Sequence, residues 1–133
     1  MYRWVEHTGE LELEIESESE EGVFTEAVDA VAELLADEED APEGPRSERE
    51  VSVAGVDRPR LLAAWLGELA FLAETEGLVP IGLRQLRIGE GALGATIVAQ
   101  RTDPPHLIKA VTYHRLSFEQ LDGRWRARAV LDV

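Results

Sequence analysis

The sequence of 133 residues contains no cysteine and only one lysine, Lys109. The absence of cysteine excludes disulfide scaffolds, cysteine-ligated zinc, iron–sulfur clusters and thiol catalysis, and it is typical of a reducing compartment. No apolar stretch approaches the roughly 18 residues that a transmembrane helix needs, and residues 1–10 lack the apolar segment of a secretory signal peptide. We therefore expect a cytoplasmic protein that makes no membrane contact.

Basic residues are scarce as a class. The chain carries 13 Lys and Arg residues against 27 Asp and Glu residues, which gives a formal net charge of −14 at pH 7. Such a chain is repelled by phosphate backbones, so we expect no direct binding to nucleic acid. The densest acidic tract, residues 37–50, contains two prolines and a glycine but no periodic apolar residues. This composition predicts a solvated acidic loop over about 37–50.

The common catalytic motifs are also missing. The sequence contains no nucleophile-elbow, Walker-type, dinucleotide-binding or His-Glu-x-x-His pattern, so no catalytic residue is identified by motif. The composition is that of an ordinary globular protein, with 44% hydrophobic and 30% charged residues. Because 133 residues is the size of one domain, we expect residues 1–133 to form a single domain.

Hydrophobic periodicity predicts strands and two helices. Residues 10–16 alternate strictly between aliphatic residues and glutamates, as in a half-buried strand. An apolar stripe predicts a helix over 24–36, and a second helix should begin after Asp57, carry Trp65 in the core and end at Gly77. Further strands are predicted over 50–54, 81–88, 92–101, 108–121 and 124–132, with a loop at Pro104-Pro105 and a hairpin turn at Asp122-Gly123. This order indicates an α+β fold, with two helices packed on an antiparallel or mixed β-sheet.

The acidic ends of two strands form a candidate metal site. Glu10 and Asp132 both lie on polar strand faces, so their carboxylates converge with the terminal carboxylate of Val133 if the first and last strands are neighbours. Three like charges at one place must bind a cation, take up protons or remain spread out in water. Oxygen donors alone favour a hard ion, Ca²⁺ or Mg²⁺. The alternative is a solvated acidic strand end.

Four motifs resemble those of the archease family and occur in the family's order. The segment EHTGE at residues 6–10 is similar to the family's D/E-H-T-A-D signature. It is followed by G-x-D at residues 55–57 ahead of LL and WLGEL, by IKAVTYH at residues 108–114, and by VLDV at residues 130–133. The match spans nearly the whole chain. The sequence departs from the signature at two positions, with Glu10 in place of the usual Asp and Gly9 in place of the usual Ala.

The resemblance implies an archease-like fold and an accessory role, not an enzymatic one. Archeases activate the RtcB-type tRNA-splicing RNA ligase, which uses GTP and a divalent metal, and they promote its guanylylation and multiple turnover. The family binds Ca²⁺ through residues that correspond to Glu10, Asp132 and Val133. Because Glu10 is longer than Asp, the coordination could shift, which Ca²⁺ tolerates better than Mg²⁺. The alternative role is a chaperone-like modulator of RNA-modifying enzymes such as a tRNA methyltransferase.

Two further questions stay open from the residues alone. A metal-dependent hydrolase could use His7 or His114 as a base beside the carboxylates, although no nucleophile is spaced to pair with either. The segment 108–114 could border a partner surface, or it could be an ordinary strand with Tyr113 in the core. The pattern favours strand packing.

Overall fold

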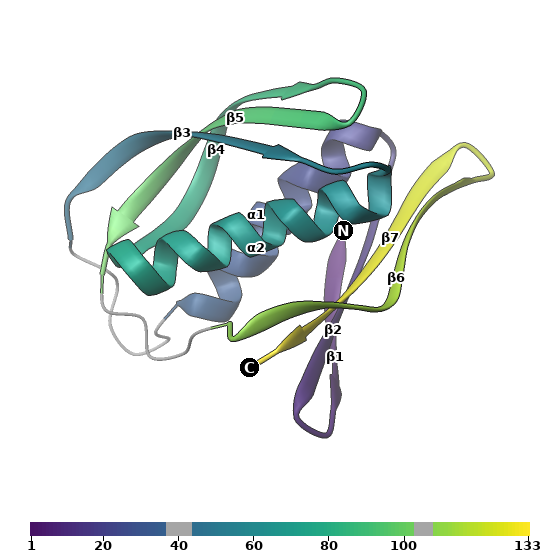
Figure 1. Cartoon of the computed structure of the whole chain (residues 1–133), viewed down its shortest axis with the longest axis horizontal. Coiled ribbons are helices and arrows are strands. Elements are labelled where there is room, and N and C mark those ends of the chain that lie inside the picture. The colour runs from purple at the N-terminus through teal and green to yellow at the C-terminus, as the bar shows by residue number, and fades with distance from the viewer. Residues whose placement is uncertain (37–43, 103–107) are drawn as a thin grey trace.

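The computed structural model describes residues 1–36, 44–102 and 108–133. Within these ranges the chain forms seven strands and two helices, arranged as in Figure 1. In chain order they are β1 (Tyr2–His7), β2 (Glu10–Ser17), α1 (Glu20–Leu35), β3 (Arg46–Ala54), α2 (Arg58–Glu76), β4 (Leu78–Ile88), β5 (Ala92–Arg101), β6 (Ala110–Leu121) and β7 (Arg124–Asp132).

The strands form two sheets, one with the order β1-β2-β7-β6 and the other with the order β3-β5-β4. Every pair of neighbouring strands in the described ranges is antiparallel. The two helices pack against each other and against strands of both sheets. The predicted α+β class, with two helices on antiparallel sheet, is therefore confirmed. The parallel pairing of a mixed sheet does not occur among these strands.

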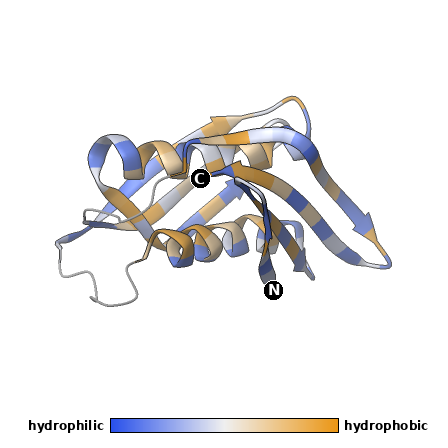
Figure 2. Ribbon diagram, turned by 90° about the horizontal axis from the view of Figure 1, so that it is seen from below, coloured by the Kyte–Doolittle hydropathy of each residue, from blue (hydrophilic) through white to orange (hydrophobic). Residues whose placement is uncertain are grey.

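The apolar helix faces meet the inner faces of the strands in one shared core. Leu13 and Ile15 of β2 are buried there, as the strict alternation predicts, and the alternation along the strands is visible in Figure 2. Trp65 of α2 is fully buried, and its indole Nε1–H donates to the carbonyl oxygen of Phe24 at 3.1 Å. The largest core side chain thus has its polar atom satisfied, and it links the two helices.

The local signals at helix and hairpin ends are confirmed. Asp57 caps α2, with its Oδ1 accepting from the backbone N–H of Arg60 at 2.9 Å. Gly77 ends the helix in the left-handed conformation at φ 63°. Asp122 and Gly123 have φ angles of 52° and 76°, the two positive values that a type I′ hairpin turn requires.

We expect the substitution Asp57→Ala to lower the free energy of unfolding by about 1 kcal/mol, because it removes the side-chain acceptor at the start of α2. Urea unfolding followed by circular dichroism measures this. Asp57→Ser keeps an acceptor at the same position and should recover most of the loss. An alanine variant as stable as the wild type would show that the cap does not contribute.

Several elements differ from the predictions: β4, for example, begins at Leu78 rather than at residue 81. Helix α1 begins at Glu20 rather than at residue 24, because Ser19 caps it through a hydrogen bond from the Gly22 N–H at 3.0 Å, and its first turn is polar. Strand β3 begins at Arg46, so residues 46–50 of the predicted acidic loop are strand, while residues 37–43 lie outside the described ranges. Residues 2–7 form a separate strand, β1, that the periodicity did not indicate.

The predicted Pro104-Pro105 loop also lies outside the described ranges. Neither α1 nor α2, the helices of the described part, is both long enough and apolar enough to cross a bilayer.

Strand β1 is tied to helix α1 by Tyr2, whose hydroxyl donates to Glu33 Oε2. This hydrogen bond, together with partial burial and the negative charge of Glu33, raises the pKa of Tyr2 to about 12. Because the pKa of Tyr2 in the folded protein exceeds the usual value near 10, this hydrogen bond contributes fully to the free energy of unfolding below about pH 10. The contribution is lost as the pH rises towards 12. We expect the phenolate absorbance of the Tyr113→Phe variant, in which Tyr2 is the remaining tyrosine, to titrate well above pH 10. A midpoint at the ordinary value would contradict this.

Candidate functional site

The register of the four-stranded sheet brings the predicted metal ligands together. Glu10 of β2 is directly opposite Asp132 of β7, and on its other side it is opposite His7 of β1. Residues directly opposite in an antiparallel pair point to the same face, with Cβ atoms about 4.5–5.5 Å apart. Val133 follows Asp132 and is 41% exposed. We call Glu10, Asp132 and Val133 the acidic row.

Local structure holds both parts of the acidic row in place. Strands β1 and β2 are joined by the two-residue turn Thr8-Gly9, and Gly9 has a φ of 76°, a value that favours glycine. The last residues of β7 lie between β2 and β6, and the carbonyl oxygen of Asp132 accepts from the backbone N–H of Lys109 at 2.8 Å. The condition on which the sequence prediction depended, that the first long strand and the last strand are neighbours, is therefore met.

The acidic row differs from the rest of the same sheet face in its charge balance. Glu14 and Glu16 bind arginines, with Arg3 Nε at 2.6 Å and Arg124 Nε at 2.7 Å from the respective carboxylates. The hydrogen bond from Arg3 lowers the pKa of Glu14 below its usual value. In contrast, no ion pair within the described part of the chain involves Glu10 or Asp132. The row is thus an anionic end of an otherwise charge-balanced face.

The donor chemistry of the row fits a hard divalent cation. Three carboxylates supply up to six oxygen atoms, and Ca²⁺ takes about six to eight oxygen ligands, with water completing the shell. The described residues contain no group of three His, Cys, Asp or Glu side chains that could hold a metal ion. Among the described residues, the carboxylates of Glu10 and Asp132 are therefore not joined by a third such side chain, and the main-chain carboxylate of Val133 is the third ligand that the sequence predicts.

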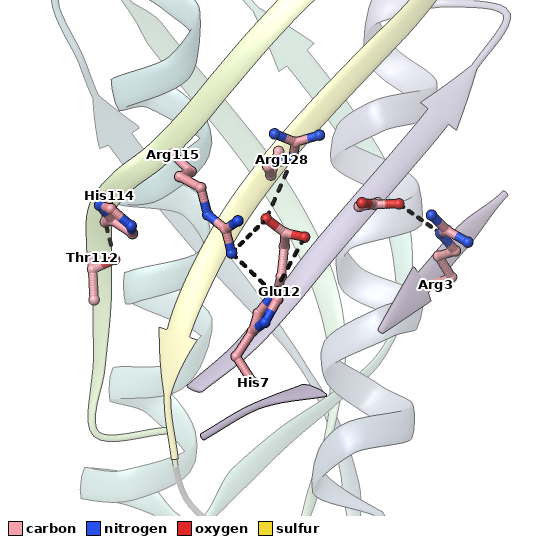
Figure 3. A network of polar contacts seen from close by, with 8 residues as sticks. Arg3, His7, Glu12, Thr112, His114, Arg115 and Arg128 are labelled. Carbon is pink, nitrogen blue, oxygen red and sulfur yellow. Dashed lines mark hydrogen bonds and ion pairs between the residues drawn. The ribbon is translucent and has the colours of Figure 1, made fainter. Parts of the chain in front are cut away.

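A second charged cluster, which the sequence did not reveal, lies beside the row on the same face. Glu12 is only 4% exposed, although alternation placed it with the other outward glutamates. Arg115 Nη2 and Arg128 Nε lie 3.3 and 3.5 Å from its Oε1, and His7 Nε2 lies 3.7 Å from its Oε2. Figure 3 shows the three basic side chains converging on Glu12 from neighbouring strands. We call these four residues the Glu12 cluster.

An irregularity in β6 brings Arg115 to this cluster. Thr112 is opposite Val130, but the next paired residue of β6 is Ser117, so residues 113–116 face a single residue of β7. We call residues 113–116 the β6 bulge. Arg115 within it has a φ of 56°, in the left-handed region that side chains other than glycine rarely adopt.

The β6 bulge also corrects the interpretation of the segment 108–114. Tyr113 is 67% exposed, not part of the core, and the guanidinium of Arg60 lies 5.9 Å from the centre of its ring. Val111 packs partly against the core, and Ile108 is buried. Within this segment Ile108 and Val111 therefore pack towards the core, while Tyr113 and His114 at its end are exposed.

The chain is similar to known proteins over nearly its whole length. The model of the archease protein family (MTH1598/TM1083) matches residues 2–133. The archease of Methanopyrus kandleri is 33% identical, with 97% of this chain and 96% of the relative covered. That of Methanosarcina mazei is 31% identical, with 99% and 95% covered.

Solved structures show the same fold. The solution structure of protein 1598 from Methanobacterium thermoautotrophicum superimposes with a TM-score of 0.74 at 27% identity, covering 99% of this chain and 98% of that one. A crystal structure from Thermotoga maritima, described as an archease and possible chaperone, gives a TM-score of 0.65 at 22% identity, covering 100% and 98%. At that identity the second structure supports the fold alone.

Proposed function

Because the chain belongs to the archease family, we propose that it is an accessory protein, not an enzyme, that activates an RtcB-type tRNA-splicing RNA ligase in the cytoplasm. In this proposal it promotes guanylylation of the ligase and its multiple turnover. The observation that carries the proposal is the acidic row, in which Glu10 and Asp132 are directly opposite each other and bind no basic side chain of the described part. Two neighbouring carboxylates without a basic partner are suited to binding a divalent cation, and the ligase of this proposal uses a divalent metal.

In the proposed mechanism, Glu10, Asp132 and the carboxylate of Val133 would hold Ca²⁺ or Mg²⁺. When bound, such an ion would supply positive charge that can stabilise phosphate groups. This chain contributes the placement of the ligands. The Thr8-Gly9 turn and the hydrogen bond between Lys109 and Asp132 fix the strand ends that carry the carboxylates.

The net charge of −14 supports association with a basic protein surface. Opposite charges speed encounter between proteins and make the association rate sensitive to salt. The same charge opposes direct contact with RNA, so in this proposal the RNA is bound by the ligase. We expect the concentration of this protein that gives half-maximal activation to rise as the salt concentration rises.

The test is guanylylation of a cognate RtcB-type ligase with radiolabelled GTP, with and without this protein. We expect the protein to raise the rate and to allow more than one ligation per ligase molecule, and we expect a chelator that removes Ca²⁺ and Mg²⁺ from the protein before mixing to weaken the effect. No stimulation by the wild-type protein would contradict the proposal. Suppression of aggregation of unrelated clients, without any effect on the ligase, would favour the chaperone-like alternative.

A further inference from the structure

Glu12 is a buried carboxylate whose basic neighbours act on it through their charge. It is 4% exposed, and such burial is unfavourable unless positive groups compensate for the lost hydration. Arg115 Nη2 and Arg128 Nε lie 3.3 and 3.5 Å from its Oε1, but this oxygen accepts no hydrogen bond. The two guanidinium groups therefore compensate for the burial of Glu12 by charge attraction, which has no strict directional requirement and acts beyond the contact itself.

The Glu12 cluster carries more positive than negative charge. Besides its contact with Glu12, Arg115 Nη2 donates to His7 Nε2 at 2.9 Å. Arginine can only donate, so His7 Nε2 is the acceptor and the imidazole is the neutral form with its proton on Nδ1. Two arginines then face one carboxylate, and the cluster has one positive charge in excess.

Arg115 brings this positive charge close to the acidic row. Its guanidinium contacts both His7 and Glu12, as Figure 3 shows. His7 is directly opposite Glu10, and Glu12 is two residues from Glu10 on the same strand face. Directly opposite residues have Cβ atoms about 4.5–5.5 Å apart, and residues two apart on a strand are separated by about 6.6 Å. Both spacings are shorter than the roughly 10 Å over which charges interact at 0.1 M salt.

We infer that the charge of the Glu12 cluster sets the affinity of the acidic row for its cation: Arg115 lowers this affinity, and Glu12 limits the reduction. The inference rests on the proposed function, in which the row holds Ca²⁺ or Mg²⁺, and adds what controls the strength of binding. A guanidinium beside the row repels a divalent cation, whereas the carboxylate of Glu12 cancels part of that repulsion. The row therefore binds its ion more weakly, and releases it more readily, than it would without a basic neighbour.

The experiment is calorimetric titration with Ca²⁺ at about 0.1 M salt. It compares the wild type with Arg115→Gly, Glu12→Gln and the variant that carries both substitutions. Glycine suits the φ of 56° at position 115, and glutamine keeps the size of Glu12 without its charge. We expect Arg115→Gly to bind Ca²⁺ about fivefold more tightly and Glu12→Gln about fivefold more weakly. The double variant restores the net charge of the cluster and should bind within about twofold of the wild type.

Two controls separate the effect of charge from an effect on structure. The differences among the variants should shrink at about 1 M salt, because salt screens charges. Glu14→Gln breaks the ion pair with Arg3 on the same strand face, about 13 Å from Glu10, and should leave the Ca²⁺ affinity as in the wild type. If circular dichroism shows that Arg115→Gly does not fold, Arg128→Gln removes the other guanidinium of the cluster and should also tighten Ca²⁺ binding.

The opposite signs of the two single variants decide the matter. If the cluster only holds the strands together, both substitutions should weaken Ca²⁺ binding. A folded Arg115→Gly variant that binds Ca²⁺ no more tightly than the wild type would therefore overturn the inference and leave the proposed function intact. A wild-type protein that binds Ca²⁺ but does not activate the ligase would overturn the proposed function alone. If the wild type takes up no Ca²⁺, the metal site fails and the inference fails with it.

Discussion

The double variant Glu10→Ala/Asp132→Ala should lose activation of the ligase by about 100-fold or more, because it removes both side-chain ligands of the proposed ion. Each carboxylate is in a strand pair, and alanine is compatible with both positions, so the fold should persist. The guanylylation rate at saturating concentration of the variant measures the effect. Circular dichroism and thermal unfolding of the same sample establish that the variant is folded.

Three controls separate the parts of this result. Glu10→Asp shortens one ligand but keeps its charge, so it should retain most of the activation with an altered metal affinity. A single glycine appended after Val133 moves the terminal carboxylate and tests that ligand alone. Glu14→Gln removes a carboxylate of the same strand face that binds Arg3 instead of lying in the acidic row, and it should have no effect. Full activation by the double variant would exclude the acidic row from the mechanism.

The substitution Trp65→Ala should lower the free energy of unfolding by about 3–5 kcal/mol. Trp65 is fully buried between the helices and the sheets, so its removal leaves a cavity that the surrounding side chains cannot close. It also leaves the carbonyl oxygen of Phe24 without the indole donor. Because such a loss is a large part of the stability of a small domain, the variant should unfold at markedly lower urea concentration.

Trp65→Phe distinguishes the two contributions. Phenylalanine fills much of the volume but cannot donate to Phe24, so the loss should fall to about 1–3 kcal/mol. Urea unfolding of both variants, fitted with the same dependence of free energy on urea concentration, gives the loss in the free energy of unfolding for each variant. An alanine variant within 1 kcal/mol of the wild type, roughly the effect of a single cap, would contradict the central position of this side chain.

Much of the fold is predictable because it depends on local chemistry. The strict alternation of residues 10–16 predicts β2, and the Asp122-Gly123 pair predicts the turn before β7. Asp57 and Gly77 predict the two ends of α2, because one is a typical N-cap residue and the other a typical C-cap residue. In contrast, the charged composition of residues 46–49 predicts a loop, but these residues form an exposed part of β3 because β5 supplies their partners. Pairing between distant segments overrides composition there.

The candidate site shows the same division. The sequence predicts that Glu10 lies beside Asp132 if the first long strand and the last strand are neighbours, because alternation places both side chains on polar faces at the strand ends. The burial of Glu12 could not, because Glu12 has the same sequence context as Glu14. The difference arises from the β6 bulge, where a register shift carries Arg115 across the sheet face. Nothing in the residues around Arg115 predicts its positive φ or the register shift, because arginine is not typical of that conformation.

Calorimetric titration of the wild-type protein with Ca²⁺ and with Mg²⁺, compared with Asp132→Asn, tests the central claim most directly. We expect the wild type to take up one ion per chain, with tighter binding of Ca²⁺ than of Mg²⁺, and an affinity at least about tenfold weaker when the charge of Asp132 is removed. Wild-type protein that takes up neither ion, or an Asp132→Asn variant that binds as tightly as the wild type, would contradict it.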